Sequence, residues 1–147
     1  MKISIACDHG GYDLKTELIP FLNKMGLETV DFGCFSKESM DYPDAALPCA
    51  EAVQKGEAEM GIVICTTGIG VSICANKVKG IRCALCTSSF QAEMTRRHNN
   101  ANMLALGAKT VSTEEAKDIV KMFFNTSFEG GRHARRVDKI IEYDNKR

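Results

Sequence analysis

The sequence predicts an α/β fold in which a parallel five-stranded sheet carries helices on both faces. Short apolar runs rich in β-branched residues alternate along the chain with longer stretches of helical periodicity. The runs are nearly continuous in their apolar character, which is typical of parallel strands that are buried on both sides. No linker or low-complexity segment interrupts the pattern, so we expect residues 1–147 to form one domain.

The first half of the chain contains three of the expected strands. Residues 2–7 have Ile at alternate positions, and residues 12–25 then place apolar side chains at helical spacing before Gly26. Residues 27–32 form the second expected strand. Pro43 suits the first turn of a helix that continues to about residue 54, and the wholly apolar residues 60–65 form the third strand.

The second half repeats the alternation. The loop at residues 66–70 leads into a helix that ends near Lys77, and residues 81–86 form the fourth expected strand. Ser88 begins a helix through His98, and residues 102–106 form the fifth strand. Ser112 or Thr113, with Glu115, marks the start of another helix, and the basic segment 128–147 contains a last one.

Composition excludes several classes of function. The 19 basic and 19 acidic residues cancel, so the chain lacks the one-signed field that a nucleic acid or an anionic membrane surface requires. No apolar run approaches the ~20 residues of a membrane span. The seven cysteines are odd in number and irregularly spaced, which favours reduced thiols in the cytoplasm over a disulfide framework.

Cys83 and Cys86 have the spacing of a redox or zinc motif. Residues three apart in a strand point to opposite faces, so we expect these two thiols to be core residues that share no metal. The remaining cysteines have no ligand-like spacing, and the sequence predicts no metal site.

Ligands of open parallel sheets bind at the carboxyl ends of the strands. That rule selects the loops at residues 8–11, 65–70 and 87–89. In the second of these loops, Cys65 precedes a helix entry that contains Gly68 and Gly70. Free amide groups and the helix dipole would attract an anion there and favour a thiolate on Cys65, a base or nucleophile. The alternative is a buried cysteine followed by an ordinary turn.

Three further groups could bind or react with an anionic substrate, and each has a structural alternative. Asp8 and His9 could relay a proton, or could form a turn with an exposed histidine. His98 with its asparagine neighbour could act as an acid, or could cap a helix. Arg132 and Arg136 lie four apart, so on a helix they could grip a phosphate together, or could form a solvated face.

Taken together, these residues resemble the ribose-5-phosphate isomerase B family, which also includes the galactose-6-phosphate isomerase subunits. The motifs that carry the resemblance cover nearly the whole chain: Asp8-His9-Gly10-Gly11, Asp41-Tyr42-Pro43, Gly61-Ile62-Val63-Ile64-Cys65, Gly68-Ile69-Gly70, Ala75-Asn76-Lys77, Gly80-Ile81-Arg82, His98-Asn99, Asn102, Leu106-Gly107 and Gly130-Gly131-Arg132-His133. The resemblance implies a three-layer α/β/α Rossmann-like domain, a homodimer or tetramer with active sites between subunits, and no cofactor or metal.

The resemblance also implies a role for each candidate residue. Cys65 would move a proton between C1 and C2 of a sugar phosphate, and His98 would help to open the sugar ring. The implied substrate ligands are Asp8, His9, Thr66, Thr67, Gly68, Ile69, Gly70, Asn99 and Lys109, with Arg132 and Arg136 on the phosphate. The loop amides would stabilise the enediolate, an anion that develops beside fixed dipoles.

Two departures from the family pattern bear on the substrate. The family loop commonly reads Cys-Gly-Thr-Gly, whereas this chain has Thr66 after Cys65; a threonine there would be strained if the loop required a positive φ. Lys109 stands where the family often has arginine, which keeps the charge and loses the bidentate fork. The chain keeps Cys65 and the Asp8-His9 pair, which galactose-6-phosphate isomerase subunits of one type tend to lack, so the resemblance implies an isomerase of ribose 5-phosphate, in the pentose phosphate pathway. The alternatives are an isomerase of allose or galactose 6-phosphate and a non-catalytic sugar-phosphate sensor.

Overall fold

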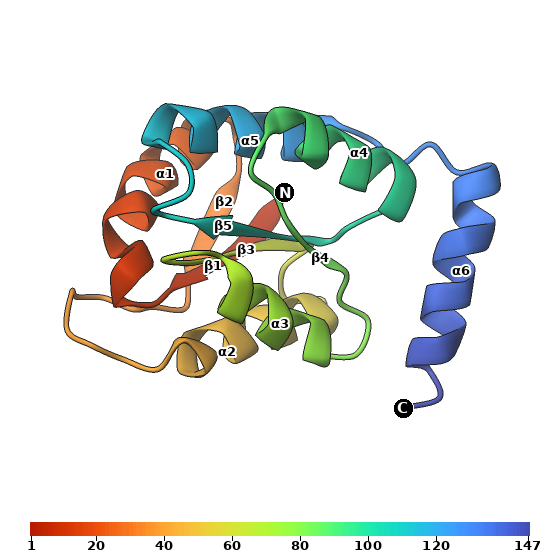
Figure 1. Ribbon diagram of the computed structural model, residues 1–147, viewed down its shortest axis with the longest axis horizontal. Coiled ribbons are helices and arrows are strands. Elements are labelled where there is room, and N and C mark those ends of the chain that lie inside the picture. The colour runs from red at the N-terminus through yellow and green to blue at the C-terminus, as the bar shows by residue number, and fades with distance from the viewer.

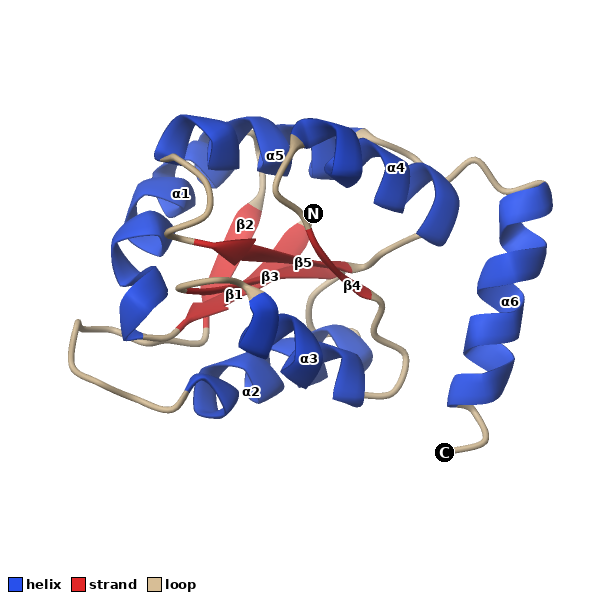
Figure 2. Cartoon of the chain, viewed as in Figure 1, coloured by secondary structure: helices blue, strands red, loops and turns tan.

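A computed structural model describes residues 1–147, and its helices cover both faces of one central sheet (Figures 1 and 2). The strands are β1 (Lys2–Cys7), β2 (Glu28–Asp31), β3 (Met60–Cys65), β4 (Cys83–Leu85) and β5 (Met103–Gly107). The helices are α1 (Tyr12–Lys24), α2 (Tyr42–Gln54), α3 (Ile69–Lys77), α4 (Ser89–Asn99), α5 (Thr113–Asn125) and α6 (Arg132–Asp144), with a short 3-10 turn η1 (His9–Gly11).

All five strands are parallel, in the order β2-β1-β3-β5-β4. The predicted α/β/α fold is thereby confirmed. The register pairs Cys7 with Ile64 and Cys65 with Gly107, so β1, β3 and β5 end side by side. The loops that follow these three strands therefore share one edge of the sheet, which we call the carboxyl edge.

Side-chain size differs between the two faces of the sheet. Large residues such as Ile62, Ile64 and Leu104 belong to a core cluster shared with α1 and α5. Small residues such as Ala6 and Ala105 belong to a second cluster with the alanines of α2 and α3. Small side chains on both surfaces let α2 and α3 approach the sheet closely, and Cys65 lies in this second cluster.

The structure confirms the order of the expected elements and corrects their bounds by one or two residues. β4 begins at Cys83 rather than at residue 81, because the Ile81 N–H is held in a turn by the Val78 carbonyl. Cys83 and Cys86 belong to different core clusters, as their spacing predicted. None of the helices combines the length and the apolar character that crossing a membrane requires.

Helix α6 is the element that packs least closely on the rest of the fold. Figure 1 shows it at the right, beyond the last turn of α4 and away from the sheet. One face of α6 buries His133 and Val137, while Ile140 and Tyr143 remain 50% and 72% exposed. Asp144 ties its end to the body by accepting a hydrogen bond from the Gly80 N–H at 2.6 Å. A chain this size seldom leaves such apolar side chains together in water without a partner.

Candidate active site

Cys65 is the last residue of β3 and is only 6% exposed. Its Sγ accepts a hydrogen bond from the Gly68 N–H at 3.2 Å. The N-terminus of α3 follows directly. Its first amide, the Ile69 N–H, donates to Thr67 Oγ1 at 3.3 Å, whereas the N–H groups of Gly70 and Val71 make no hydrogen bond within the chain and can bind a ligand. The thiol therefore lies between a donated N–H and the N-terminus of a helix.

The loop between Cys65 and α3 takes its shape from Gly68. That residue has φ +78°, and a Cβ built on it would lie 2.5 Å from Leu85 Cδ1 and 2.9 Å from the Leu106 carbonyl carbon. Only glycine fits this position. Thr66 does not have a positive φ, since Asn100 is the one non-glycine residue that does, so no strain arises at Thr66.

The loop after β1 lies directly against the Cys65 loop. A Cβ on Gly10 would collide with Thr66 Oγ1, so the missing side chain lets the two loops touch. Asp8 is 7% exposed, and its Oδ1 accepts hydrogen bonds from the N–H groups of Gly10 and Gly11 at 2.9 and 3.2 Å. The second carboxylate oxygen, Oδ2, makes no hydrogen bond within the chain and can accept one from a ligand.

His9 is exposed at the same edge, and its Nδ1 accepts a hydrogen bond from the Met40 N–H at 3.2 Å. A neutral imidazole whose Nδ1 is an acceptor carries its proton on Nε2. The Met40 contact therefore turns His9 into an N–H donor towards the solvent side of the edge, where a ligand oxygen can bind.

Two further residues of this edge were not assigned to it from sequence order. β5 rather than β4 neighbours β3, so the loop after β5 contacts the Cys65 loop, and the Lys109 N–H donates to the Thr66 carbonyl at 3.0 Å. The third loop selected from the sequence, residues 87–89, follows the edge strand β4 instead. Tyr42, noted before only as part of a motif, lies with its ring against Gly70.

The other predicted site residues form a second group around the last turn of α4 and the first turn of α6. The His98 ring stacks on the His133 ring, with centroids 4.1 Å apart. Arg132 and Arg136 are exposed on α6, and Asn99 is exposed beside His98. Glu129 lies between them, 3.5 Å from Arg97 and 3.4 Å from His133. Glu129 and His133 were not expected in the site, although they lie four residues apart at the start of the last helix.

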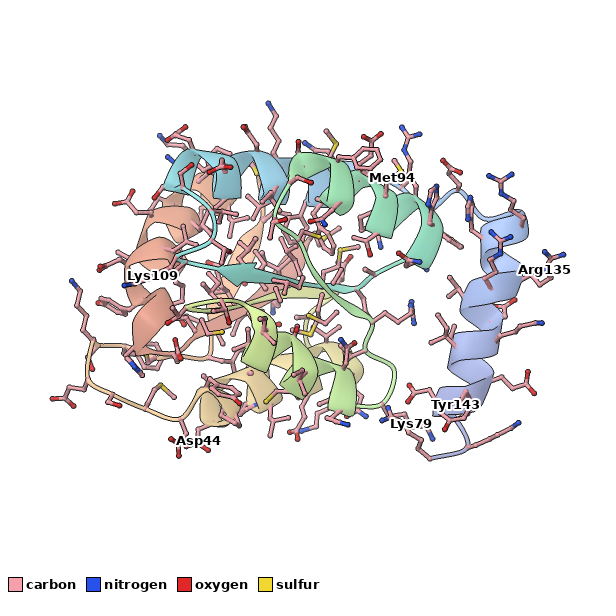
Figure 3. The ribbon with its side chains drawn as sticks, in the orientation of Figure 1. Asp44, Lys79, Met94, Lys109, Arg135 and Tyr143 are labelled. Atoms are coloured by element: carbon pink, nitrogen blue, oxygen red, sulfur yellow. The ribbon has the colours of Figure 1, made fainter.

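The two groups lie at opposite edges of the sheet. α4 starts beyond the carboxyl end of β4 and runs back to the opposite edge of the sheet, where the strands begin, which we call the amino edge. There the Asn99 carbonyl accepts a hydrogen bond from the side chain of Arg82, which lies just before β4. β3 alone, with six residues rising ~3.3 Å each, separates the two edges by about 16 Å. Figure 3 labels Lys109 near one end of the molecule and Arg135, on α6, at the other. Cys65 and His98 of one chain therefore cannot act on the same sugar.

A cavity of about 490 Å³ lies between α6 and the amino edge, but Cys65 does not line it. Its walls include Ile81, Ala84 and Ile140 with the polar side chains of Asn99 and Asp144. A second hollow, of about 580 Å³, lies between the starts of α1 and α5. Its lining includes Gly10 and Lys109, with three acidic side chains and one threonine from the two helices. We place the candidate chemistry at Cys65 rather than in either cavity, because geometry and hydrogen bonding converge there.

Comparisons with known proteins identify the family of this chain. Residues 3–140 match the model of the family described as Ribose/Galactose Isomerase. Ribose-5-phosphate isomerase B of Escherichia coli is 44% identical over 146 residues, 99% of this chain and 98% of the relative. The structure of ribose-5-phosphate isomerase B from Clostridium thermocellum superposes with a TM-score of 0.97 at 56% identity, covering 99% of both chains. The enzyme from Mycoplasma genitalium, solved with bound ribulose-5-phosphate, superposes with a TM-score of 0.96 at 42% identity, covering 99% of this chain and 97% of that one. This chain belongs to the ribose/galactose isomerase family.

Proposed function

We propose that this protein is an aldose–ketose isomerase that interconverts ribose 5-phosphate and ribulose 5-phosphate. The observation that carries the proposal is the Cys65 sulfur, which is held beside the uncapped N-terminus of α3 by the Gly68 N–H. It is supported by the 44% identity to ribose-5-phosphate isomerase B of Escherichia coli.

In the proposed reaction, the Cys65 thiolate removes the proton from C2 of the open-chain aldose phosphate and returns it to C1, while the hydroxyl proton of O2 passes to O1, so that the aldehyde becomes an alcohol and C2 becomes the ketone. The intermediate is an enediolate, whose negative charge develops on the sugar oxygens. In the loop from Thr66 to Gly70, the amides of Thr66, Thr67 and Gly70 make no hydrogen bond within the chain. They are already oriented by the loop and need no rearrangement to stabilise that charge. Asp8 and His9 bind the sugar hydroxyl groups from the neighbouring loop.

Ring opening and phosphate binding require the second group of residues, and we assign these steps to a second copy of the chain. His98 of the second copy donates or accepts the ring-opening proton, Asn99 binds the sugar, and Arg132 and Arg136 hold the phosphate. The separation of about 16 Å between the two edges within one chain supports this assignment.

The exposed apolar surface supports a homodimer. Ile69 and Ile73 lie one turn apart on α3, next to the Cys65 loop, and are 53% and 55% exposed. Ile140 and Tyr143 form a second exposed apolar strip on α6. A second copy that brings its α6 end to the α3 face of the first would bury both strips and complete the site. We place this dimer in the cytoplasm, where its seven free cysteines stay reduced.

A direct assay tests the proposal. The purified protein should convert ribose 5-phosphate, and Cys65→Ala should lower turnover by about two to three orders of magnitude, the usual scale for loss of a positioned base. Near-normal turnover of Cys65→Ser would contradict the assignment of the base. Comparing kcat/KM for ribose 5-phosphate with kcat/KM for allose and galactose 6-phosphates separates the five-carbon from the six-carbon substrate, and no turnover of any of them would favour a sensor.

A further inference from the structure

Three metal-ligand side chains converge at the junction of α4 and α6. They are His98 from the last turn of α4, His133 from the first turn of α6, and Glu129 from the segment between α5 and α6. One ligand atom of each lies within 4.8 Å of the other two. Two imidazoles and a carboxylate are a donor set that zinc uses in proteins, with a fourth position left open.

The spacing of these atoms is close to what a tetrahedral ion requires. Ligand bonds of ~2.0–2.1 Å at tetrahedral angles place neighbouring donor atoms about 3.4 Å apart. His133 Nε2 and Glu129 Oε2 are already 3.4 Å apart. The stacked imidazoles are nearly parallel, at 13°, so the half-buried His98 ring must turn for its nitrogen to reach the same point.

The local charges permit a cation despite the nearby arginines. Arg97 is the cation closest to Glu129, at 3.5 Å, but it is bound more tightly by Glu93, at 2.8 Å. Arg97 can therefore keep one carboxylate when Glu129 turns to an ion.

We propose that His98, Glu129 and His133 bind a divalent transition-metal ion of the Zn²⁺ class, and that the bound ion inhibits isomerisation. The bound ion inhibits because it occupies the nitrogen lone pair that His98 needs to move the ring-opening proton. This half of the inference rests on the proposed function. The ion is an inhibitor and takes no part in the reaction.

Binding is tested with Co²⁺, whose visible absorption reports tetrahedral ligands and whose near-ultraviolet charge-transfer band reports thiolates. Wild type should give the visible bands without the thiolate band, although the chain has seven cysteines. Glu129→Gln should raise the Kd by at least about tenfold, the lower end of what even outer ligand changes cost a metal site. Glu142→Gln, at an exposed glutamate further along α6 that pairs with Lys146 and not with Arg97, is the matched control and should leave the Kd unchanged. Equal affinity of Glu129→Gln and wild type, or a thiolate band, overturns the site.

Inhibition is tested separately with Zn²⁺ in the ribose 5-phosphate assay. Zn²⁺ should inhibit wild type reversibly, with activity restored by EDTA, and Glu129→Gln should need at least about tenfold more Zn²⁺ for the same inhibition. Cobalt binding at this site without any Zn²⁺ inhibition would overturn the inhibitory half. A protein that binds Co²⁺ here but isomerises nothing in metal-free buffer would refute the proposed function and leave the metal site standing.

Discussion

Replacing Gly68 by alanine should damage stability and activity more than the same change at another glycine of equal backbone conformation. Gly68 has φ +78° and Gly56 has φ +75°, so an alanine at either position must adopt a left-handed backbone conformation. That conformation costs each variant roughly 1–2 kcal/mol. A Cβ on Gly56 would meet nothing within 4 Å, whereas a Cβ on Gly68 would lie 2.9 and 3.0 Å from backbone atoms of Leu106 and Gly107.

Backbone atoms of a central strand cannot withdraw as a flexible side chain can, so the clash should add about 1–3 kcal/mol at Gly68. We therefore expect Gly68→Ala to lower the free energy of unfolding by roughly 2–5 kcal/mol and Gly56→Ala by roughly 1–2 kcal/mol. Urea unfolding followed by circular dichroism measures both. Gly68→Ala should also reduce kcat/KM, because displacing the loop moves the N–H group that donates a hydrogen bond to the Cys65 sulfur. Gly56→Ala should leave kcat/KM unchanged. Equal losses of stability in the two variants would refute the steric argument.

Three further expectations concern the second group of residues. His98→Asn should reduce turnover of ribose 5-phosphate far more than turnover of a short aldose phosphate that cannot cyclise; equal losses in the two assays would mean that His98 has another role. Replacing Arg132 and Arg136 singly by alanine should each weaken binding of the phosphorylated sugar by one to two orders of magnitude, from about 1.5–3 kcal/mol per charge-assisted contact, and should hardly change binding of the free sugar. Burial chiefly lowers the pKa of His133 from 6.5, so on acidification the unfolded chain takes up a proton before the folded protein does. The contribution of His133 to the free energy of unfolding should be fully present above about pH 6.5 and should be lost as the pH falls from there through the folded pKa. Unfolding curves in which the free energy of unfolding stays constant or rises over this range would contradict the expectation.

The fold class could be predicted from the sequence because the spacing of apolar residues matches the buried positions of the strands and helices along most of the chain. The apolar run of residues 60–65 became β3 without change, and the serine and glutamate pattern at Ser112 became a capping box at the start of α5. Bounds failed where side chains or turns took over backbone hydrogen bonds. At β4, the Arg82 N–H donates to the Asn102 side chain and not to a neighbouring strand, so the strand starts late.

The sequence could name candidate site residues but not their arrangement in space. The family resemblance named Lys109 as a substrate ligand. Because strand order is not sequence order, however, the strand-end rule selected residues 87–89 rather than the loop after β5, which contacts the Cys65 loop through Lys109. Whether Thr66 would be strained depended on its φ angle, which the sequence does not give. In the structure Gly68 has the positive φ of this loop, and Thr66 does not. His98 and Cys65 both matched a family motif, yet their separation at opposite edges appears only once the direction of α4 is known.

Subunit mixing tests the central claim, that one active site is built from two copies of the chain. Cys65→Ala removes the proposed base at the carboxyl edge, and Arg132→Ala/Arg136→Ala removes the phosphate clamp at the amino edge. Each variant alone should be inactive. After subunit exchange, a mixed dimer should regain one intact site of its two, because wild-type Cys65 from one copy meets the wild-type arginines of the other. No recovery of ribose 5-phosphate isomerisation, with exchange verified on tagged subunits, would contradict a site shared between copies.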